Sequence, residues 1–239
     1  MKKKYFGTDG IRGTVNTSKI NGEKFFKFGL AAGTYFKNLK KKKQVAIIAK
    51  DTRLSGYTLE PALVSGLASA GMHIFTLGPL PTNGLAMLTK KMKANMGIMI
   101  TASHNAPRYN GMKLKAAYGG SALPELCRKV EVYLNDNESQ GRGPNLIDFD
   151  EAREKGLITR FNPIPAYQDH IRKLINFDVI AENPQYIVVD SMYGSGRGVI
   201  KGLLEGTGCE VHEIRNEMNP GFGGVHPEPI GQYLSALSG

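Results

Sequence analysis

Apolar residues in the first part of the chain alternate between helical spacing and short continuous runs. Residues 23–39 place them three and four positions apart, which predicts an amphipathic helix. Residues 45–49 are a continuous apolar run rich in β-branched side chains and predict a buried strand. Further strands are expected at 73–77 and 97–101, and between them a helix that Thr82 caps and that runs to about residue 91. Strands that are apolar on both faces and alternate with helices are typical of a parallel sheet covered on both sides.

A second alternation of the same kind begins near residue 166, after a polar, turn-rich stretch and two prolines. The expected order is helix, strand, helix, strand, at residues 167–175, 186–189, 197–204 and 209–214. We therefore predict an α/β protein with two parts. Residues 1–150 form a three-layer α/β/α domain with a mixed, mainly parallel sheet, and residues 151–239 form an incomplete second α/β/α domain.

Composition and charge exclude some functional classes and leave one alternative open. No run of about 18 uncharged apolar residues exists, so we expect no membrane span. The N-terminal lysines are not followed by an apolar stretch, and the two cysteines lack metal-ligand spacing, which together predict a cytoplasmic protein. The net charge of +10 and the four lysines at residues 40–43 allow nucleic-acid binding. Because no aromatic residues interleave these lysines, a solvated loop is favoured and no nucleic-acid partner is predicted.

The candidate chemistry gathers in loops that follow predicted strands. Thr101-Ala102-Ser103-His104-Asn105 comes directly after the strand at 97–101. Ligands of open α/β sheets bind beyond the carboxyl ends of the strands, and a serine there can act as a nucleophile or carry a phosphate. A Ser-His-Asn segment alone is more often an ordinary turn.

Three neighbouring segments make the ordinary turn a poor explanation. Asn110-Gly111-Met112-Lys113 offers a turn followed by a lysine that could act as a general acid or base. Residues 6–13 and 50–56 are loops that present Arg12 and Arg53, and arginine suits bidentate phosphate contacts. Together with residues 189–196 and 223–229, these segments resemble the α-D-phosphohexomutase superfamily, which includes phosphoglucosamine mutase and phosphomannomutase/phosphoglucomutase.

The resemblance implies intramolecular phosphoryl transfer between the 1- and 6-positions of a hexose phosphate, in carbohydrate metabolism. Ser103 would be the phosphoserine and a ligand of Mg²⁺, and a hexose bisphosphate would be the activating intermediate. His104 would lie beside the phosphate, Lys113 would be an acid/base candidate, and Arg12 would contact the phosphoserine or the sugar. The remaining expected substrate- or phosphate-binding residues are Asn105, Thr8 and Arg53.

Two departures from the family pattern affect this expectation. Ala106 stands where the family usually has a proline, with Pro107 one position later, which predicts a small loop adjustment. The family's Asp-Gly-Asp-x-Asp-Arg metal loop and its later sugar- and phosphate-binding domains do not occur before Gly239. We therefore expect little or no mutase activity from these 239 residues alone. The alternative is a non-catalytic remnant that binds a phosphosugar or a partner, with self-association through the surface that later domains would cover.

Overall fold

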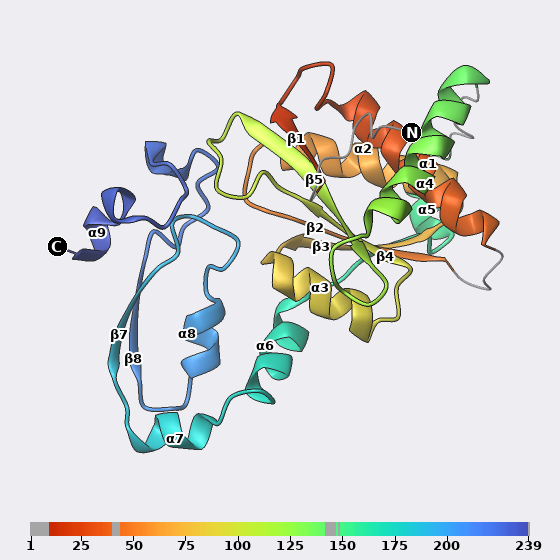
Figure 1. The fold of residues 1–239 in the computed structure, drawn as a ribbon. Helices are drawn as coiled ribbons and strands as arrows, with labels where there is room; N and C mark the ends of the chain where they lie inside the picture. Colours follow the sequence, from red (N-terminus) through yellow and green to blue (C-terminus); the bar gives the residue numbers. More distant parts are fainter. Residues whose placement is uncertain (1–9, 40–43, 142–146, 148, 239) are drawn as a thin grey trace.

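The first α/β unit is built on a six-stranded sheet, seen in a computed structural model that describes residues 10–39, 44–141, 147 and 149–238 (Figure 1). The strand order is β1-β5-β4-β2-β3-β6. Strands β4, β2, β3 and β6 are parallel, whereas β5 runs antiparallel to β4, which confirms the mixed, mainly parallel sheet. The strands are β1 (Ile11–Thr14), β2 (Val45–Lys50), β3 (His73–Pro79), β4 (Met96–Ile100), β5 (Tyr109–Ala116) and β6 (Ile158–Arg160).

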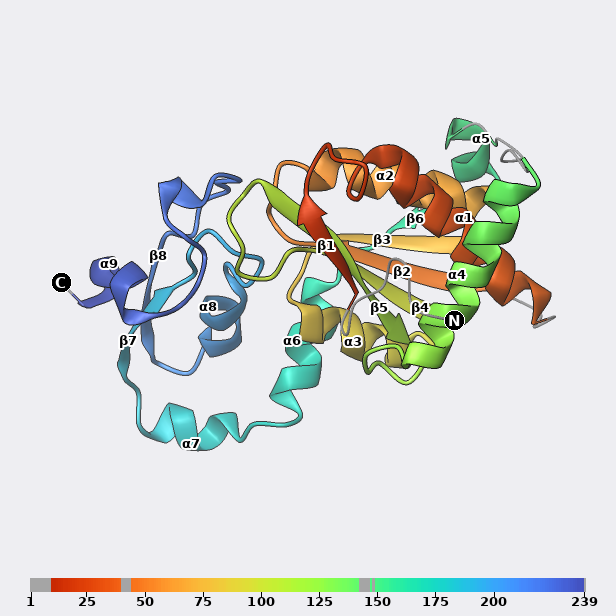
Figure 2. The same ribbon diagram turned by 45° about the horizontal axis from the view of Figure 1, so that its top comes forward.

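Helices cover both faces of this sheet, as Figure 2 shows. On one face lie α1 (Gly22–Asn38), α2 (Gly56–Ser69) and α4 (Pro124–Ser139), and on the other lies α3 (Thr82–Lys91). The short helix α5 (Phe149–Glu154) precedes β6. Strand β2 lies in the middle of the sheet, and its alternating side chains enter both cores, with Ile48 in one and Ile47 in the other. This explains why its sequence is almost entirely apolar.

Helices α1 and α2 pack closely because glycines lie where their backbones meet. A Cβ built on Gly66 would lie 2.1 Å from the carbonyl oxygen of Phe26, and one on Gly29 would lie 2.4 Å from that of Leu63. Neither contact can be relieved by rotating a side chain, since both involve backbone atoms. The two glycines therefore set the distance between the helices.

Replacing Gly66 with alanine is expected to lower the free energy of unfolding by about 1–3 kcal/mol, because the added methyl forces the helices apart. Urea unfolding followed by circular dichroism measures this change. Gly22→Ala is the matched control, since a Cβ there meets only the Cβ of Ala62, at an ordinary 3.8 Å. Equal stability of the two variants would contradict this account of the helix contact.

The second α/β unit contains a two-stranded parallel sheet of β7 and β8. Its helices and strands are α6 (Ile164–Arg172), α7 (Phe177–Glu182), β7 (Tyr186–Asp190), α8 (Val199–Leu204), β8 (Glu210–Ile214) and α9 (Ser235–Ser238), with 3-10 turns η1 (Phe222–Gly224) and η2 (Gly231–Tyr233). The helix–strand order is the one predicted from the sequence, with α7 in addition. In the part of the chain that the structure describes, no helix combines the length and the apolar character needed to cross a bilayer.

The two units share a hydrophobic core on the α3 side of the larger sheet. Leu85 and Met99 of the first unit cluster with Tyr167, Val199 and Leu203 of the second. Strand β6 pairs with β3, so the first sheet takes in a strand beyond the boundary expected at residue 150. That boundary stays a prediction, as does self-association. Residues 40–43, on which the nucleic-acid alternative depended, lie outside the described residues.

Candidate active site

The candidate site lies at the edge of the sheet where the parallel strands β2 and β4 end. Ser103, in the loop after β4, is exposed, and its backbone φ is +59°, in the left-handed region that serine rarely adopts. That conformation costs on the order of 1–2 kcal/mol, so other contacts must hold it. The Ser103 N–H donates to Oγ1 of Thr101 at 2.9 Å, and the Thr101 hydroxyl donates to Oδ2 of Asp51 at 2.7 Å. Asp51, directly after β2, thus supports the loop of the neighbouring strand.

Arg53 is the main support of the serine loop. Its side chain is fully buried, and its Nε donates to Oδ2 of Asp51 at 2.9 Å. Its two terminal nitrogens donate to four loop carbonyls, at distances of 2.6–3.0 Å. These carbonyls belong to Ser103, Asn105, Ala106 and Tyr109. The guanidinium therefore fixes the backbone on both sides of His104.

The structure corrects the expected direct contact between Arg53 and a substrate phosphate. A guanidinium has five N–H donors, and all five are used within the protein. Because the side chain is also closed off from solvent, Arg53 positions the loop and does not offer a hydrogen bond to a ligand. Its position directly after a core strand was visible in the sequence, but its burial was not.

Two expected phosphate-site residues meet at the rim of the same loop. Nη1 of Arg12, on β1, donates to Oδ1 of Asn105 at 2.8 Å. Oγ of Ser103 lies 3.3 Å from Nδ1 of His104, so the hydroxyl and the ring are in hydrogen-bond contact. A cationic side chain, an amide, an imidazole and an exposed hydroxyl thus converge at one end of the sheet.

Lys113 lies on β5, the strand next to β4, further from Ser103 along the sheet. It pairs with Met99 of β4, while Arg12 pairs with Gly111 two positions before it on β5. Because side chains alternate along a strand, Arg12 and Lys113 leave the sheet on the same face. The role of Lys113 as an acid or base stays a prediction. Thr8 lies outside the described residues.

The described residues do not by themselves fit Mg²⁺. Mg²⁺ prefers octahedral oxygen ligands, usually including carboxylates. Among residues 10–39, 44–141, 147 and 149–238, no group of three or more His, Cys, Asp or Glu side chains is placed to hold a metal ion. Asp51, the acidic residue behind the serine loop, is already engaged by Thr101 and Arg53. Ser103 as a metal ligand therefore stays a prediction.

Sequence reasoning missed the contribution of the second unit to this loop. The ring of Phe222 packs on the Arg53 guanidinium, with the guanidinium carbon 5.2 Å from the ring centroid, and is itself buried. The Thr52 hydroxyl donates to the Tyr193 carbonyl at 2.9 Å. A carboxylate oxygen of Glu228 lies 4.0 Å from Nε2 of His104. These contacts join segments more than a hundred residues apart, and in the sequence residues 189–196 and 223–229 contributed only to the family resemblance.

The fold and the serine loop define a class of protein, and comparison of the chain with known protein families identifies that class. The pattern of the family described as "Phosphoglucomutase/phosphomannomutase, alpha/beta/alpha domain I" matches residues 3–141, and that of its domain II matches residues 165–238. The chain belongs to this family. The expected membership of the α-D-phosphohexomutase superfamily and the expected fold class are both confirmed.

Relatives and solved structures match over almost the whole chain. A phosphoglucosamine mutase of Pelagibacter ubique (strain HTCC1062) is 53% identical over 219 residues, which are 90% of this chain and 47% of that protein. One of Parvibaculum lavamentivorans is 39% identical over 92% of this chain and 47% of its own length. The crystal structure of a putative phosphomannomutase from Thermus thermophilus superposes with a TM-score of 0.85 at 28% identity, covering 98% of this chain and 51% of that one. The chain spans about half the length of the curated relatives it matches.

Proposed function

We propose that this chain carries the phosphoserine of a phosphohexomutase that interconverts the 1- and 6-phosphates of a hexose in carbohydrate metabolism. The observation that supports this most directly is Ser103 itself. It is exposed at the carboxyl edge of the sheet and held in a left-handed conformation by Thr101 and Arg53. A residue whose strained backbone conformation is held by several surrounding contacts is typical of a functional position. Because relatives of this chain are named phosphoglucosamine mutase, glucosamine phosphate is the proposed substrate.

The proposed reaction transfers one phosphoryl group from Ser103 to the sugar and another from the sugar back to Ser103. The bond between phosphorus and Oγ of Ser103 breaks as the 1-hydroxyl of a hexose 6-phosphate attacks and loses its proton, which gives the 1,6-bisphosphate. The 6-phosphoryl group then moves to Oγ, and the proton returns to the freed 6-hydroxyl. Phosphoryl transfer depends on positioning and on facing cations, which Arg12 and Lys113 would supply on one face of the sheet. His104 would contact the phosphate, and Asn105 would hold Arg12 in place.

The proposal includes Mg²⁺ as the cofactor, with the Ser103 phosphate as one ligand, and a cytoplasmic location. Since the described residues supply no carboxylate cluster, we assign no step to the ion. For the same reason we propose that the 239-residue chain turns over hexose phosphate slowly or not at all by itself. A coupled mutase assay with glucosamine 6-phosphate, bisphosphate primer and Mg²⁺ measures this, and robust turnover would contradict it.

Phosphorylation of Ser103 tests the proposal more directly, because it needs only one transfer per chain. The purified chain is incubated with a hexose 1,6-bisphosphate and Mg²⁺, and tandem mass spectrometry locates the phosphoryl group. We expect the phosphoryl group on Ser103 and none in Ser103→Ala. Ser191→Ala, in the second unit, is the control and should be labelled like the unaltered chain. Reversible sugar binding without phosphate on Ser103 would favour the non-catalytic alternative.

A further inference from the structure

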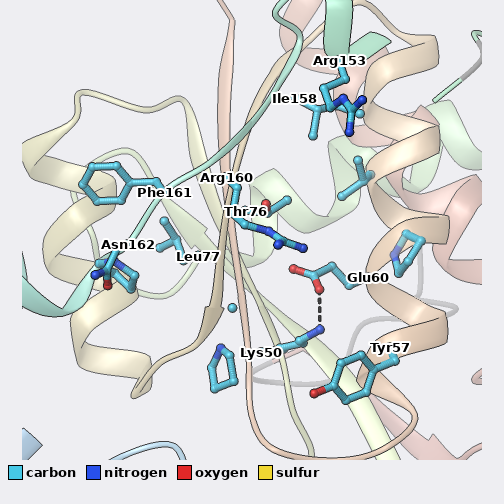
Figure 3. Close-up of a pocket in the computed structure, with 15 residues that line it drawn as sticks. Lys50, Tyr57, Glu60, Thr76, Leu77, Arg153, Ile158, Arg160, Phe161 and Asn162 are labelled. Carbon is cyan, nitrogen blue, oxygen red and sulfur yellow. Dashed lines mark hydrogen bonds and ion pairs between the residues drawn. The ribbon is translucent and has the colours of Figure 1, made fainter. Parts of the chain in front are cut away.

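A cavity of about 690 Å³, separate from the serine loop, lies beside β2 and β3 (Figure 3). It opens between α2, the ends of β2 and β3, and the segment that runs from α5 through β6. Three parallel strands that lie side by side, β2, β3 and β6, contribute Lys50, Thr76 and Arg160 to its lining. The volume falls within the range of about 300–1,000 Å³ that is usual for small-molecule sites.

The charges around this cavity do not cancel. Glu60 on α2 is neutralised by Lys50, whose Nζ lies 2.6 Å from Oε2 and 4.1 Å from the centroid of the Tyr57 ring. This pair is largely buried, with 8% and 13% of the two side chains exposed. At the rim, Arg153 forms an exposed pair with Asp150 at 3.6 Å. What remains is the positive charge of Arg160.

Arg160 and Thr76 present hydrogen-bond donors to the cavity side by side. They are direct partners in the register of β6 and β3, so both side chains leave the sheet on the α2 face. In Figure 3 the Arg160 side chain reaches across β3 toward Glu60. Within the described part of the chain, no ion pair or hydrogen bond is formed by its guanidinium or by the Thr76 hydroxyl. A guanidinium beside a hydroxyl suits a phosphate, which accepts several hydrogen bonds.

The rest of the cavity offers an apolar surface rather than further charges. Val64 from α2 and Ile158 of β6 line the cavity on the same side of the strands as Arg160, and Phe161, after β6, lines it on the other side (Figure 3). A free phosphate ion would leave this surface and most of the volume unused. We propose that the cavity is a second anion site, separate from the serine loop, that binds a small molecule bearing a phosphate group on an apolar body.

Phenyl phosphate is a suitable probe, with inorganic phosphate and phenol as its two halves. Each is titrated into the ¹⁵N-labelled chain, and amide shifts give the binding site and the dissociation constant. We expect phenyl phosphate to bind more tightly than either half and to shift amides at residues 76–78 and 158–162. Tighter binding elsewhere on the chain, or equal binding of phenol, would overturn the proposal.

Variants separate this cavity from its rim and from the serine loop. Arg160→Gln is expected to weaken phenyl phosphate about tenfold or more, because it removes a charge-assisted hydrogen bond. Arg153→Gln is the matched control, since that arginine also lines the cavity and is exposed like Arg160 but is already paired with Asp150, and it should change binding little. Ser103→Ala should leave binding unchanged. Loss of binding in Ser103→Ala would instead assign the probe to the serine loop, and equal loss in both arginine variants would overturn the proposal in favour of general attraction of anions.

Discussion

Replacing Arg53 with alanine is expected to lower the free energy of unfolding by about 3–5 kcal/mol, the usual cost of removing one partner of a buried ion pair. The variant leaves the carboxylate of Asp51 without its cation and four loop carbonyls without their donor. Unpaired buried polar groups are costly because they lose water without gaining a partner. Urea unfolding followed by circular dichroism measures the loss. The same change should free Ser103 from its left-handed conformation.

The lysine variant distinguishes the charge from the geometry of the guanidinium. Arg53→Lys keeps the cation but has a single nitrogen, which cannot reach Asp51 and all four carbonyls at once. We expect only a partial recovery of stability, together with faster amide hydrogen exchange in residues 103–109 than in the unaltered chain. Arg108→Ala is the control, because this arginine belongs to the same loop but is exposed. If Arg53→Lys protects these amides as well as arginine does, the multiple hydrogen bonds are not what holds the loop.

Replacing Asp190 with alanine is expected to destabilise the second unit by a similar amount, about 3–5 kcal/mol near neutral pH. Asp190, at the end of β7, receives hydrogen bonds from Nε and Nη2 of Arg215 and from the Met192 N–H. Only 2% of its side chain is exposed, against 11% for Arg215, so the variant leaves a buried cation without its carboxylate partner, although Nη2 still donates to the Tyr233 carbonyl. Thermal unfolding of the unaltered chain and of the Asp190→Ala variant measures the difference in stability. Asp169→Ala is the control, since its pair with Arg172 is exposed and long, at 3.8 Å, and little change is expected.

The stabilisation from Asp190 should depend on pH with a defined sign. Burial alone would raise the pKa of Asp190, but the hydrogen bonds from Arg215 and Met192 and the charge of Arg215 outweigh it and lower the pKa. The folded-state pKa therefore lies below the unfolded one. The contribution is fully present above pH ~4 and is lost as the pH falls through the folded-state value. The stability difference between the unaltered chain and Asp190→Asn should shrink on acidification below pH ~4. A difference that grew instead would contradict the lowered pKa.

Much of the fold could be predicted because each element carries its own local signal. Helix α1 has one apolar face and begins after Asn21, whose side chain accepts a hydrogen bond from the Lys24 N–H. Strands β2 and β4 are largely apolar because both of their faces are buried. Prediction failed where the signal was short. Strand β1 lies in a glycine-spaced segment interpreted as a loop, and β6 has only three residues. Thr82, expected to cap α3, is instead its first residue, and α3 has no side-chain capping bond.

In the serine loop, too, some features were visible in the sequence and others only in the structure. The sequence by itself determined that Ser103 follows a buried strand, with His104 and Asn105 beside it and Arg12 and Lys113 in nearby segments. These are properties of spacing and of residue type. Only the tertiary structure decided that Arg53 is buried beneath the loop and that Phe222 covers it from the second unit.

The physical reason is the range of the interactions. Periodicity and turn chemistry depend on neighbours within a few positions, so one sequence can reveal them. The environment of a guanidinium depends on backbone carbonyls some fifty positions away and on a ring far beyond them. Whether Arg53 meets a ligand or the protein's own backbone is therefore settled only when the strands align and the two units pack together. The same kind of alignment, between β3 and β6, places Thr76 beside Arg160 in the second cavity.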